Sequence, residues 1–355
     1  MSSLLLVGTR KGLFLARRGD DGWQLDGQRL AGWSVNHATA DPRDGSLLAC
    51  TNNWVYGGAF HRSTDGGETW ERSEGLAMPE GSGLTLKATW HAEPGHASRP
   101  GQLWLGVDPG GLFRSDDSGA TWEPVTGLTD HPTRERWEPG GGGMCAHSIT
   151  LDADDASRLW VGISAAGVFR TEDGGATWTP ANSGTEACFF PENRYPEVGQ
   201  CVHKVLAHPG RRGRLWQQNH CGVYRSDDAG ESWDRLDGNG LPSGFGFPIA
   251  LDPADPDVAF VVPEEGSDNR VTADGRLGVY RTGDGGTSWE LASDGLPEPA
   301  WASVKREGMS FDRDSVYLGT QAGGVYELDR ASGTWSTVAT DLPEILSVGV
   351  AAEPS

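Results

Sequence analysis

The chain has 355 residues, a length that suits two or three average domains or one large all-β domain. Its 52 glycines, 15 tryptophans and four methionines favour a turn-rich β-protein over a helical one. The formal net charge of −21 would repel phosphate backbones and anionic lipid, so we expect no nucleic-acid and no membrane partner.

The chain begins with three expected strands, at residues 4–8, 12–16 and 23–25. The apolar run at 4–7 is followed closely by Arg10 and Lys11, and it is too short for the core of a signal peptide. No stretch approaches the roughly 18 apolar residues of a membrane span. The five cysteines, at positions 50, 145, 188, 201 and 221, are odd in number and too sparse for a secreted disulfide scaffold. We therefore expect a cytoplasmic protein with free thiols.

One pattern then recurs along the chain: Ser/Thr-x-Asp-x-Gly-x-Thr/Ser-Trp. Its five clear copies end at Trp70, Trp122, Trp178, Trp233 and Trp289. Two degenerate copies, which match the pattern only in part, end at Trp23 and Trp335. The seven tryptophans are 47, 52, 56, 55, 56 and 46 residues apart. A spacing this regular indicates a repeat architecture.

Each copy is an expected Asp box, a tight β-hairpin turn. The Asp can accept hydrogen bonds from backbone N–H groups of the turn, and the Gly can take a positive φ that other residues resist. A Gly-x-aromatic strand start precedes most copies, as at Gly167-Val-Phe169. Because turn chemistry explains every position, we interpret the boxes as structural turns and not as calcium loops or catalytic carboxylates.

Each period holds four expected strands, illustrated by residues 145–151, 158–163, 167–171 and 177–180. Four strands in a repeat of this length indicate a propeller blade. Innermost strands are expected to begin near residues 33, 84, 145, 201, 245, 307 and 345. The last, 345–352, has no strands after it, so we expect it to complete the N-terminal blade and remove the exposed edges. The sequence therefore predicts an all-β, monomeric, seven-bladed β-propeller forming a single domain over residues 1–355.

The boxes and their spacing resemble the Asp-box propeller superfamily, which includes sialidases, xyloglucanases, sortilin-type receptors and a photosystem assembly factor. More closely, the chain resembles bacterial BNR-repeat proteins described as exo-α-sialidase-like or glycosyl-hydrolase-like. The resemblance covers essentially the whole chain and implies the propeller fold. The early Phe/Tyr-Arg-Ile-Pro motif of sialidases is missing, because Phe113-Arg114 and Phe169-Arg170 run straight into boxes. Arg10 is a candidate for the sialidase arginine triad, as a substrate-binding residue, but we do not expect sialidase activity.

Long loops of a propeller join the outer strand of one blade to the inner strand of the next, on the face where inner strands begin. We call this the loop face; the Asp boxes lie on the opposite face. Loops at 124–144 and 181–200 and the turn at 217–222 are expected on the loop face, and loops of this length are often functional. From these segments we select nine residues: Arg136, Trp137, Glu138, Arg194, Tyr195, Gln218, Asn219, His220 and Cys221.

Two adjacent inner strands begin with the same pattern, Cys145-Ala-His147 and Cys201-Val-His203. Strand alternation would put each Cys and its His on one side of the strand, about 7 Å apart. His37 and Glu307 are expected at nearly the same level of the channel. His131 is expected in the loop 124–144 on the loop face, and the other four histidines, at positions 61, 91, 96 and 208, are expected at outer or opposite-face positions.

The main hypothesis is an enzyme of unknown reaction whose site lies at the channel mouth over the third and fourth blades. His147, His203 and His220 would be metal ligands, for Zn, Cu or Fe, or acid–base groups. Cys145, Cys201 or Cys221 would be a further ligand or a nucleophile. Arg136 or Arg194 would hold a small polar or anionic substrate. Contacts to that substrate would come from Trp137, Tyr195, Phe245, Gln218 and Asn219.

Two alternatives stay open. A glycoside hydrolase would need two carboxylates beside the scissile bond, and the loop-face candidates are Glu138, Glu192, Glu197, Glu264, Glu265 and Glu307. A non-enzymatic binding or assembly propeller would need neither a pair of catalytic carboxylates nor a bound metal. In that case the His and Cys side chains would simply fill the channel, as buried histidines and free thiols often do.

Overall fold

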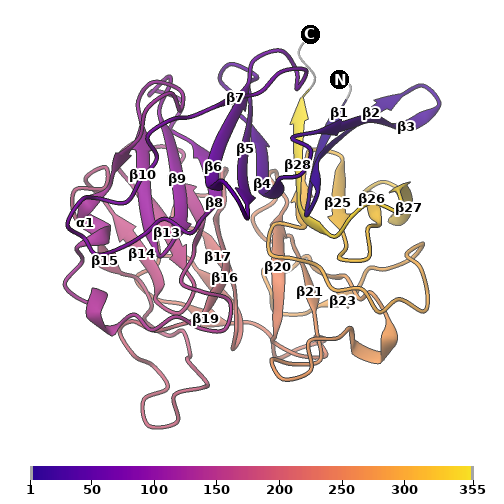
Figure 1. Cartoon of the computed structure of the whole chain (residues 1–355). Coiled ribbons are helices and arrows are strands. Elements are labelled where there is room, and N and C mark those ends of the chain that lie inside the picture. Colours follow the sequence, from indigo (N-terminus) through magenta and orange to yellow (C-terminus); the bar gives the residue numbers. More distant parts are fainter. Residues whose placement is uncertain (1–2, 353–355) are drawn as a thin grey trace.

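The computed structural model describes residues 3–352 as seven four-stranded antiparallel sheets set around a central channel (Figure 1). The prediction of an all-β seven-bladed propeller is confirmed. Residues 1–2 and 353–355 of the expected domain lie outside the described residues. Between residues 3 and 352, no helix is both long and apolar enough to cross a bilayer.

We number the blades from the first complete sheet, and in each blade the first strand lines the channel. Blades 1 to 3 contain β4 (Ser34–Ala40), β5 (Leu47–Asn53), β6 (Gly57–Ser63), β7 (Glu71–Arg72); β8 (Ala88–Pro94), β9 (Leu103–Asp108), β10 (Gly111–Ser115), β11 (Glu123–Pro124); and β12 (Ala146–Leu151), β13 (Leu159–Ile163), β14 (Gly167–Thr171), β15 (Thr179–Pro180).

Blades 4 to 6 repeat the pattern with β16 (Val202–Ala207), β17 (Leu215–Asn219), β18 (Gly222–Ser226), β19 (Asp234–Arg235); β20 (Gly246–Leu251), β21 (Ala259–Pro263), β22 (Tyr280–Thr282), β23 (Glu290–Leu291); and β24 (Met309–Phe311), β25 (Ser315–Gly319), β26 (Val325–Asp329), β27 (Thr334–Ala339). Short helical turns, α1 (Thr126–Thr129), η1 (Arg134–Arg136) and η2 (Ala273–Gly275), lie in the connecting loops.

The seventh blade joins the two ends of the chain. Its inner strand is β28 (Ile345–Ala352), followed outward by β1 (Ser3–Thr9), β2 (Gly12–Gly19) and β3 (Gly22–Arg29). β28 and β1 are antiparallel and paired from Ser3↔Ala352 to Thr9↔Ile345, and they lie side by side in Figure 1. An ion pair between Arg10 Nε and Glu344 Oε2, 2.8 Å long, continues this contact past the strand ends. The predicted closure by the C-terminal strand is therefore confirmed.

The Asp boxes have the predicted turn geometry. Asp173 Oδ1 accepts hydrogen bonds from the Thr177 N–H at 2.9 Å and the Thr171 hydroxyl at 2.8 Å. Its Oδ2 accepts one from the Thr177 hydroxyl at 2.6 Å. Gly175 has φ +93°, a left-handed value that glycine adopts without strain. The Trp178 ring then folds back, and its Nε1 donates to the Gly175 carbonyl at 3.1 Å. The carboxylate is fully used within its own turn, so the structural interpretation holds.

The inner strands carry a β-bulge near the loop face, and this bulge positions the site. The register shifts between Val35 and His37 in β4, and between Thr89 and His91 in β8. It shifts again across His147 in β12 and across His203 in β16. A bulge inserts one residue and breaks the strict alternation of sides. The side of an inner strand to which a residue near its start points therefore cannot be predicted by counting residues along the sequence.

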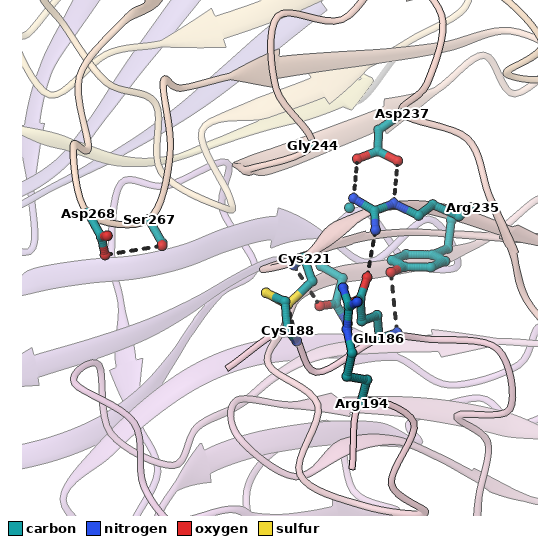
Figure 2. Close-up of a disulfide and its surroundings, with 12 residues drawn as sticks. Glu186, Cys188, Arg194, Cys221, Arg235, Asp237, Gly244, Ser267 and Asp268 are labelled. Atoms are coloured by element: carbon teal, nitrogen blue, oxygen red, sulfur yellow. Dashed lines mark hydrogen bonds and ion pairs between the residues drawn. A yellow bond between two sulfur atoms is a disulfide. The ribbon is translucent and has the colours of Figure 1, made fainter. Parts of the chain in front are cut away.

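A disulfide joins Cys188 to Cys221 and ties the loop 181–200 to the β17–β18 turn (Figure 2). The expectation of free thiols is wrong for these two residues and holds for Cys50, Cys145 and Cys201. Their separation of 33 positions hid the pairing, because the propeller brings the two segments together only in three dimensions. Beside the disulfide, the buried Glu186 carboxylate is paired with Arg194 and with Arg235 Nη1, the latter at 2.6 Å.

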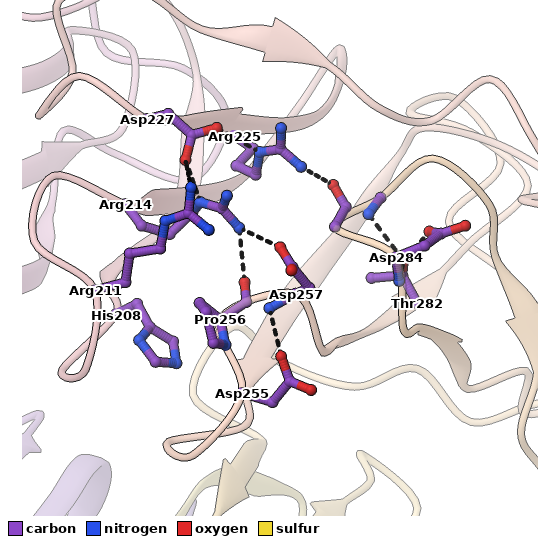
Figure 3. A network of polar contacts seen from close by, with 12 residues as sticks. His208, Arg211, Arg214, Arg225, Asp227, Asp255, Pro256, Asp257, Thr282 and Asp284 are labelled. Carbon is purple, nitrogen blue, oxygen red and sulfur yellow. Dashed lines mark hydrogen bonds and ion pairs between the residues drawn. The ribbon is translucent and has the colours of Figure 1, made fainter.

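On the Asp-box face, a polar network joins blades 4 and 5 (Figure 3). The buried Arg214 guanidinium contacts the Asp227 carboxylate of its own blade. It also donates to Asp257 Oδ1 at 2.8 Å and to the Pro256 carbonyl at 2.9 Å in the next blade. The Arg214 guanidinium and its acceptors in the two blades are hydrogen-bonded to one another. We therefore interpret this network as a structural contact between blades and not as a binding site.

Candidate functional site

A cavity of about 570 Å³ opens on the loop face, where segments of blades 3 to 6 meet. Its wall includes the glycine run 140–143, the β13–β14 turn, the loop 181–200 and the starts of the inner strands β16 and β20. Aromatic rings contribute from Phe189, Phe190 and Phe247. A cavity of this size with apolar walls and a few polar groups is typical of small-molecule sites.

Five of the residues selected from the sequence line this cavity: Arg136, Glu138, Cys201, His203 and His220. They come from the first long loop, the start of β16 and the turn that follows β17. The sequence brought them together correctly because strand starts and second-to-third-strand turns share the loop face. Arg136 is already neutralised, since its Nη1 lies 2.7 Å from Glu197 Oε2.

His147 is not with the other two histidines, so the predicted cluster is wrong in this member, whereas His203 and His220 do lie together. The His147 ring is fully buried, with Nε2 bonded to the Val202 carbonyl at 2.9 Å and Nδ1 to the Ser148 hydroxyl at 3.0 Å. His147 and His203 occupy the same bulged position of adjacent strands. His147 is covered by the start of the neighbouring strand, whereas His203 faces the cavity. Burial lowers the pKa of His147 well below its usual value, which makes it a neutral packing residue.

Other selected residues also lie outside the cavity wall. Cys221 is in the disulfide, and Arg194 is paired with Glu186. Trp137 is buried, with Nε1 donating to the Thr133 hydroxyl at 3.0 Å, while Tyr195 is 64% exposed.

The remaining four support the site from behind or lie elsewhere. Gln218 and Asn219 are buried, and Gln218 Nε2 donates to the Gly244 carbonyl at 2.8 Å. Phe245 packs against both site histidines, its ring centre lying 5.5 Å from that of His203 and 5.1 Å from that of His220. Arg10 is held by Glu344 at the edge of the seventh blade.

Cys201, His203 and His220 form a compact donor group. Their Sγ and ring nitrogens lie within 4.8 Å of one another. His203 Nδ1 is 2.5 Å from the Gly246 carbonyl, so it carries the proton and leaves Nε2 as an acceptor. Burial lowers the pKa of His203 well below its usual value and raises that of the Cys201 thiol. A thiol and two imidazoles are a donor set that Zn²⁺ or copper accepts.

Sequence reasoning missed two arginines in the cavity wall. Arg306 precedes the sixth inner strand, and its guanidinium lies 5.3 Å from the centre of the Trp90 ring. Arg270, in the β21–β22 loop, lies over Phe245 and Phe247 at 5.8 and 5.9 Å. Arg306 could have been found, because its neighbour Glu307 was already placed at the channel mouth. No local pattern marks Arg270.

Three carboxyl groups near this face differ in environment. Glu138 is exposed on the cavity wall. Asp108 ends β9 directly behind the glycine run, so that a side chain at Gly143 would begin 2.9 Å from Asp108 Oδ2. Burial raises the pKa of Asp108, and its Oδ1 is buried without a hydrogen-bond partner among the described residues. Burial also raises the pKa of Glu264, which, like Asp108, is not among the residues that line the cavity.

A second polar cluster fills the channel below the cavity. Glu307 is buried and paired with Lys204 Nζ, and its Oε1 lies 3.3 Å from His91 Nδ1. His37 stacks on His91 with ring centres 4.0 Å apart. The expected outer position of His91 is therefore wrong. Across the bulges, His37, His91 and Lys204 are equivalent positions of β4, β8 and β16, which explains why they meet.

Charge determines the state of this cluster. Burial would raise the pKa of Glu307, but Lys204 and His91 outweigh it and hold that pKa well below its usual value. Burial would lower the pKa of His91, but Glu307 and Glu93 raise it to about 9. Because Lys204 is ion-paired with the Glu307 carboxylate, the cluster is a network of ion pairs inside the channel and a poor site for a metal cation.

Comparison with known proteins supports the repeat assignment. The BNR/Asp-box repeat family matches residues 61–72, which contain the first clear box. The chain is an Asp-box repeat β-propeller. It is 26% identical to a xyloglucanase of a Paenibacillus species over 295 residues, which is 76% of this propeller and 27% of that protein. It is 32% identical to the xyloglucanase Xgh74A of Acetivibrio thermocellus over 302 residues, 76% of this propeller and 33% of that protein.

Solved structures show the same fold. The GH74 enzyme of Niastella koreensis superposes with a TM-score of 0.64 at 17% identity, over 98% of this propeller and 52% of that chain. The propeller thus spans about a quarter to a third of these curated relatives and about half of the solved enzyme.

Proposed function

We propose that this propeller is a glycoside hydrolase that binds a carbohydrate in the loop-face cavity. The observation that carries the proposal is a pair of carboxyl groups in contrasting environments: Glu138 on the cavity wall and the half-buried Asp108 behind it. Glycosidases use one carboxyl group that stays protonated and one that is ionised. The similarity to xyloglucanases supports this alternative over a sialidase.

Exposed aromatic rings on the same face also support a carbohydrate ligand. Trp54, in the β5–β6 turn, is 95% exposed, and Trp301, before β24, is 71% exposed. Phe189 and Phe190 line the cavity itself. Flat aromatic rings offer apolar faces to sugar rings while leaving the sugar hydroxyl groups in water.

In this proposal Asp108 is the general acid and Glu138 is the base or nucleophile. The raised pKa of Asp108 keeps its carboxyl group protonated to a higher pH, as proton donation to a leaving oxygen requires. The glycine run between them leaves room at the wall, because Gly141 and Gly142 have no neighbour where a side chain would begin. A sugar ring can therefore approach the backbone closely.

The test is hydrolysis of xyloglucan oligosaccharides, monitored by release of reducing ends, and of a panel of neutral and acidic aryl glycosides, monitored by release of the aryl alcohol. Asp108→Asn and Glu138→Gln should each lower kcat by at least about 100-fold, the usual range for loss of acid–base catalysis. Glu192→Gln, on an exposed part of the loop 181–200, is the matched control and should keep full activity. Hydrolysis that survives both active-site changes, or no hydrolysis of any substrate, would overturn the proposal.

The donor group Cys201, His203 and His220 favours a second candidate, a metal-dependent enzyme. Three protein ligands with an open position is the usual arrangement of catalytic zinc. The two nearby guanidinium groups oppose a cation electrostatically, so this candidate ranks second. Metal analysis and Co²⁺ absorption test it: Cys201→Ser should abolish the thiolate-to-cobalt band, and Cys145→Ser should not. Wild-type protein without bound metal and without that band would exclude it.

A further inference from the structure

We propose that the cavity selects an acidic sugar, whose anionic group binds between the guanidinium groups of Arg270 and Arg306. The inference rests on the proposed function, because it names the substrate class of the same site. It starts from a contrast in charge: the chain carries 50 acidic and 29 basic residues. In so acidic a protein, cations without a carboxylate partner inside a cavity call for an explanation.

Arg306 is such a cation. It is partly buried, and among the described residues no carboxylate oxygen lies within 4.0 Å of its guanidinium. One hydrogen bond, from Nη1 to the Ser164 hydroxyl at 3.3 Å, and the Trp90 ring hold it in place. The adjacent Glu307 carboxylate is engaged by Lys204 and His91 in the channel. A buried charge without a counterion is costly, and an anionic ligand would remove that cost.

Arg270 faces the same cavity from the β21–β22 loop. Its Nε donates to the Ser267 carbonyl at 3.3 Å, and its side chain rests on two phenylalanine rings. It too has no carboxylate within ion-pair distance in the described part of the chain. Stacking on rings orients a guanidinium while leaving its outer N–H groups free for a planar anion.

The remaining polar groups of the wall do not cancel this charge. Arg136 is balanced by Glu197, and His203 is neutral because burial lowers its pKa. Glu138 is the carboxylate among the described lining residues, and it comes from the first long loop, whereas both free arginines come from blades 5 and 6. The charges on the cavity wall are therefore separated: the carboxylate comes from the first long loop, and the two guanidinium groups come from blades 5 and 6.

Two arginines suit a carboxylate or a sulfate ester, since both accept paired hydrogen bonds from guanidinium groups. Calorimetric titration with three probes distinguishes these sources. The probes are cellobiose, cellobiouronic acid, which adds only a carboxylate, and cellobiose 6′-sulfate. We expect at least one acidic probe to bind about tenfold or more tightly than cellobiose, with an affinity that falls as salt rises.

Arg270→Gln and Arg306→Gln should each remove that preference, so that the acidic probes bind the variant no more tightly than cellobiose does. Arg270 is exposed, so its variant tests the proposal even if Arg306→Gln does not fold. Arg212→Gln, an exposed arginine on the Asp-box face, is the matched control. Equal affinity for all three probes, or a preference that survives both changes, would overturn the inference and leave the hydrolase proposal intact. Tight binding of an acidic probe without any hydrolysis would support this inference and count against the hydrolase.

Discussion

The aspartate of each of the five clear Asp boxes acts inside its own turn, where it accepts hydrogen bonds from a backbone N–H and two hydroxyl groups. Asp173→Ala should remove these bonds and lower the free energy of unfolding by about 1–2 kcal/mol. The loss is modest because the turn is exposed and water replaces part of what is lost. Urea unfolding measures it, with Asp173→Asn as a milder control. An unchanged stability combined with lost activity would contradict the structural role.

His91 and Glu307 make stability depend on pH in a defined window. The pKa of His91 rises to about 9 in the folded state, so its contribution is complete below its unfolded pKa of about 6.5. That contribution should disappear as pH rises from about 6.5 through 9, with a loss on the order of 1–3 kcal/mol. The lowered pKa of Glu307 acts in the opposite direction and protects stability down to acidic pH.

The measurement is the free energy of unfolding at several pH values for wild type and His91→Gln. The variant should be less stable at pH 6 and should lack the decline between pH 6.5 and 9. His96→Gln, a histidine on the Asp-box face that bonds to the Ala153 carbonyl, serves as the control. An identical decline in His91→Gln and wild type would show that another group is responsible.

The loop 181–200 depends on its disulfide more than on secondary structure. It carries Phe189 and Phe190 into the cavity wall, and Cys188 anchors it directly beside them. Closing a loop of 33 residues is worth about 4 kcal/mol in the chain-entropy estimate. Reduction, or the double change Cys188→Ser and Cys221→Ser, should lower Tm by several degrees and weaken ligand binding.

The check is thermal unfolding with and without reductant. Cys145→Ser should respond to reductant as wild type does, whereas the double variant should not respond at all. A Tm that is the same in reductant for wild type would mean that the disulfide adds nothing to the folded state. A cytoplasmic location stays a prediction. The disulfide is a reason to test it, because disulfides are rare in the reducing cytoplasm.

Strands were predictable from the chain because their signals are local. The fourth expected strand of blade 3, for example, overlaps β15, and the N-terminal strands match β1 to β3. The bulges were not predictable, because they depend on how neighbouring inner strands crowd around the channel. One inserted residue per strand was enough to misplace His147 and His91, while His203 was placed correctly.

The ring as a whole is held closed by β28. Removing residues 345 onward should expose the edge of β1 and uncover the inner parts of blades 1 and 6 that β28 packs against. Exposed strand edges pair with other chains, so we expect a truncated protein that aggregates, as size-exclusion chromatography would show. A soluble truncation with a single cooperative unfolding transition would contradict the closure. The monomeric state of the intact chain stays a prediction that the same measurement tests.

The site combines residues that the chain keeps far apart, and this set the limit of sequence reasoning. Cys201, His203 and His220 lie within one blade and could be grouped by strand counting. Arg270 and Arg306 belong to blades 5 and 6. Nothing near Arg270 in the chain signals its role, whereas Arg306 directly precedes Glu307, which was already placed at the channel mouth. Asp108 was missed because it ends a second strand, where a carboxylate usually faces water.

Joining the first and last strands has a consequence for synthesis on the ribosome. Arg10 and Glu344, which meet beside the closing strands, are 334 residues apart. At about 5–20 residues per second, β1 waits roughly 15 to 70 s for its partner. During that time the nascent chain carries an unpaired strand edge, and the first blades must hold together without closure. We therefore expect slow, late-completing folding that benefits from a chaperone at the tunnel exit, and the leucine-rich β1 would be the segment that the chaperone shields.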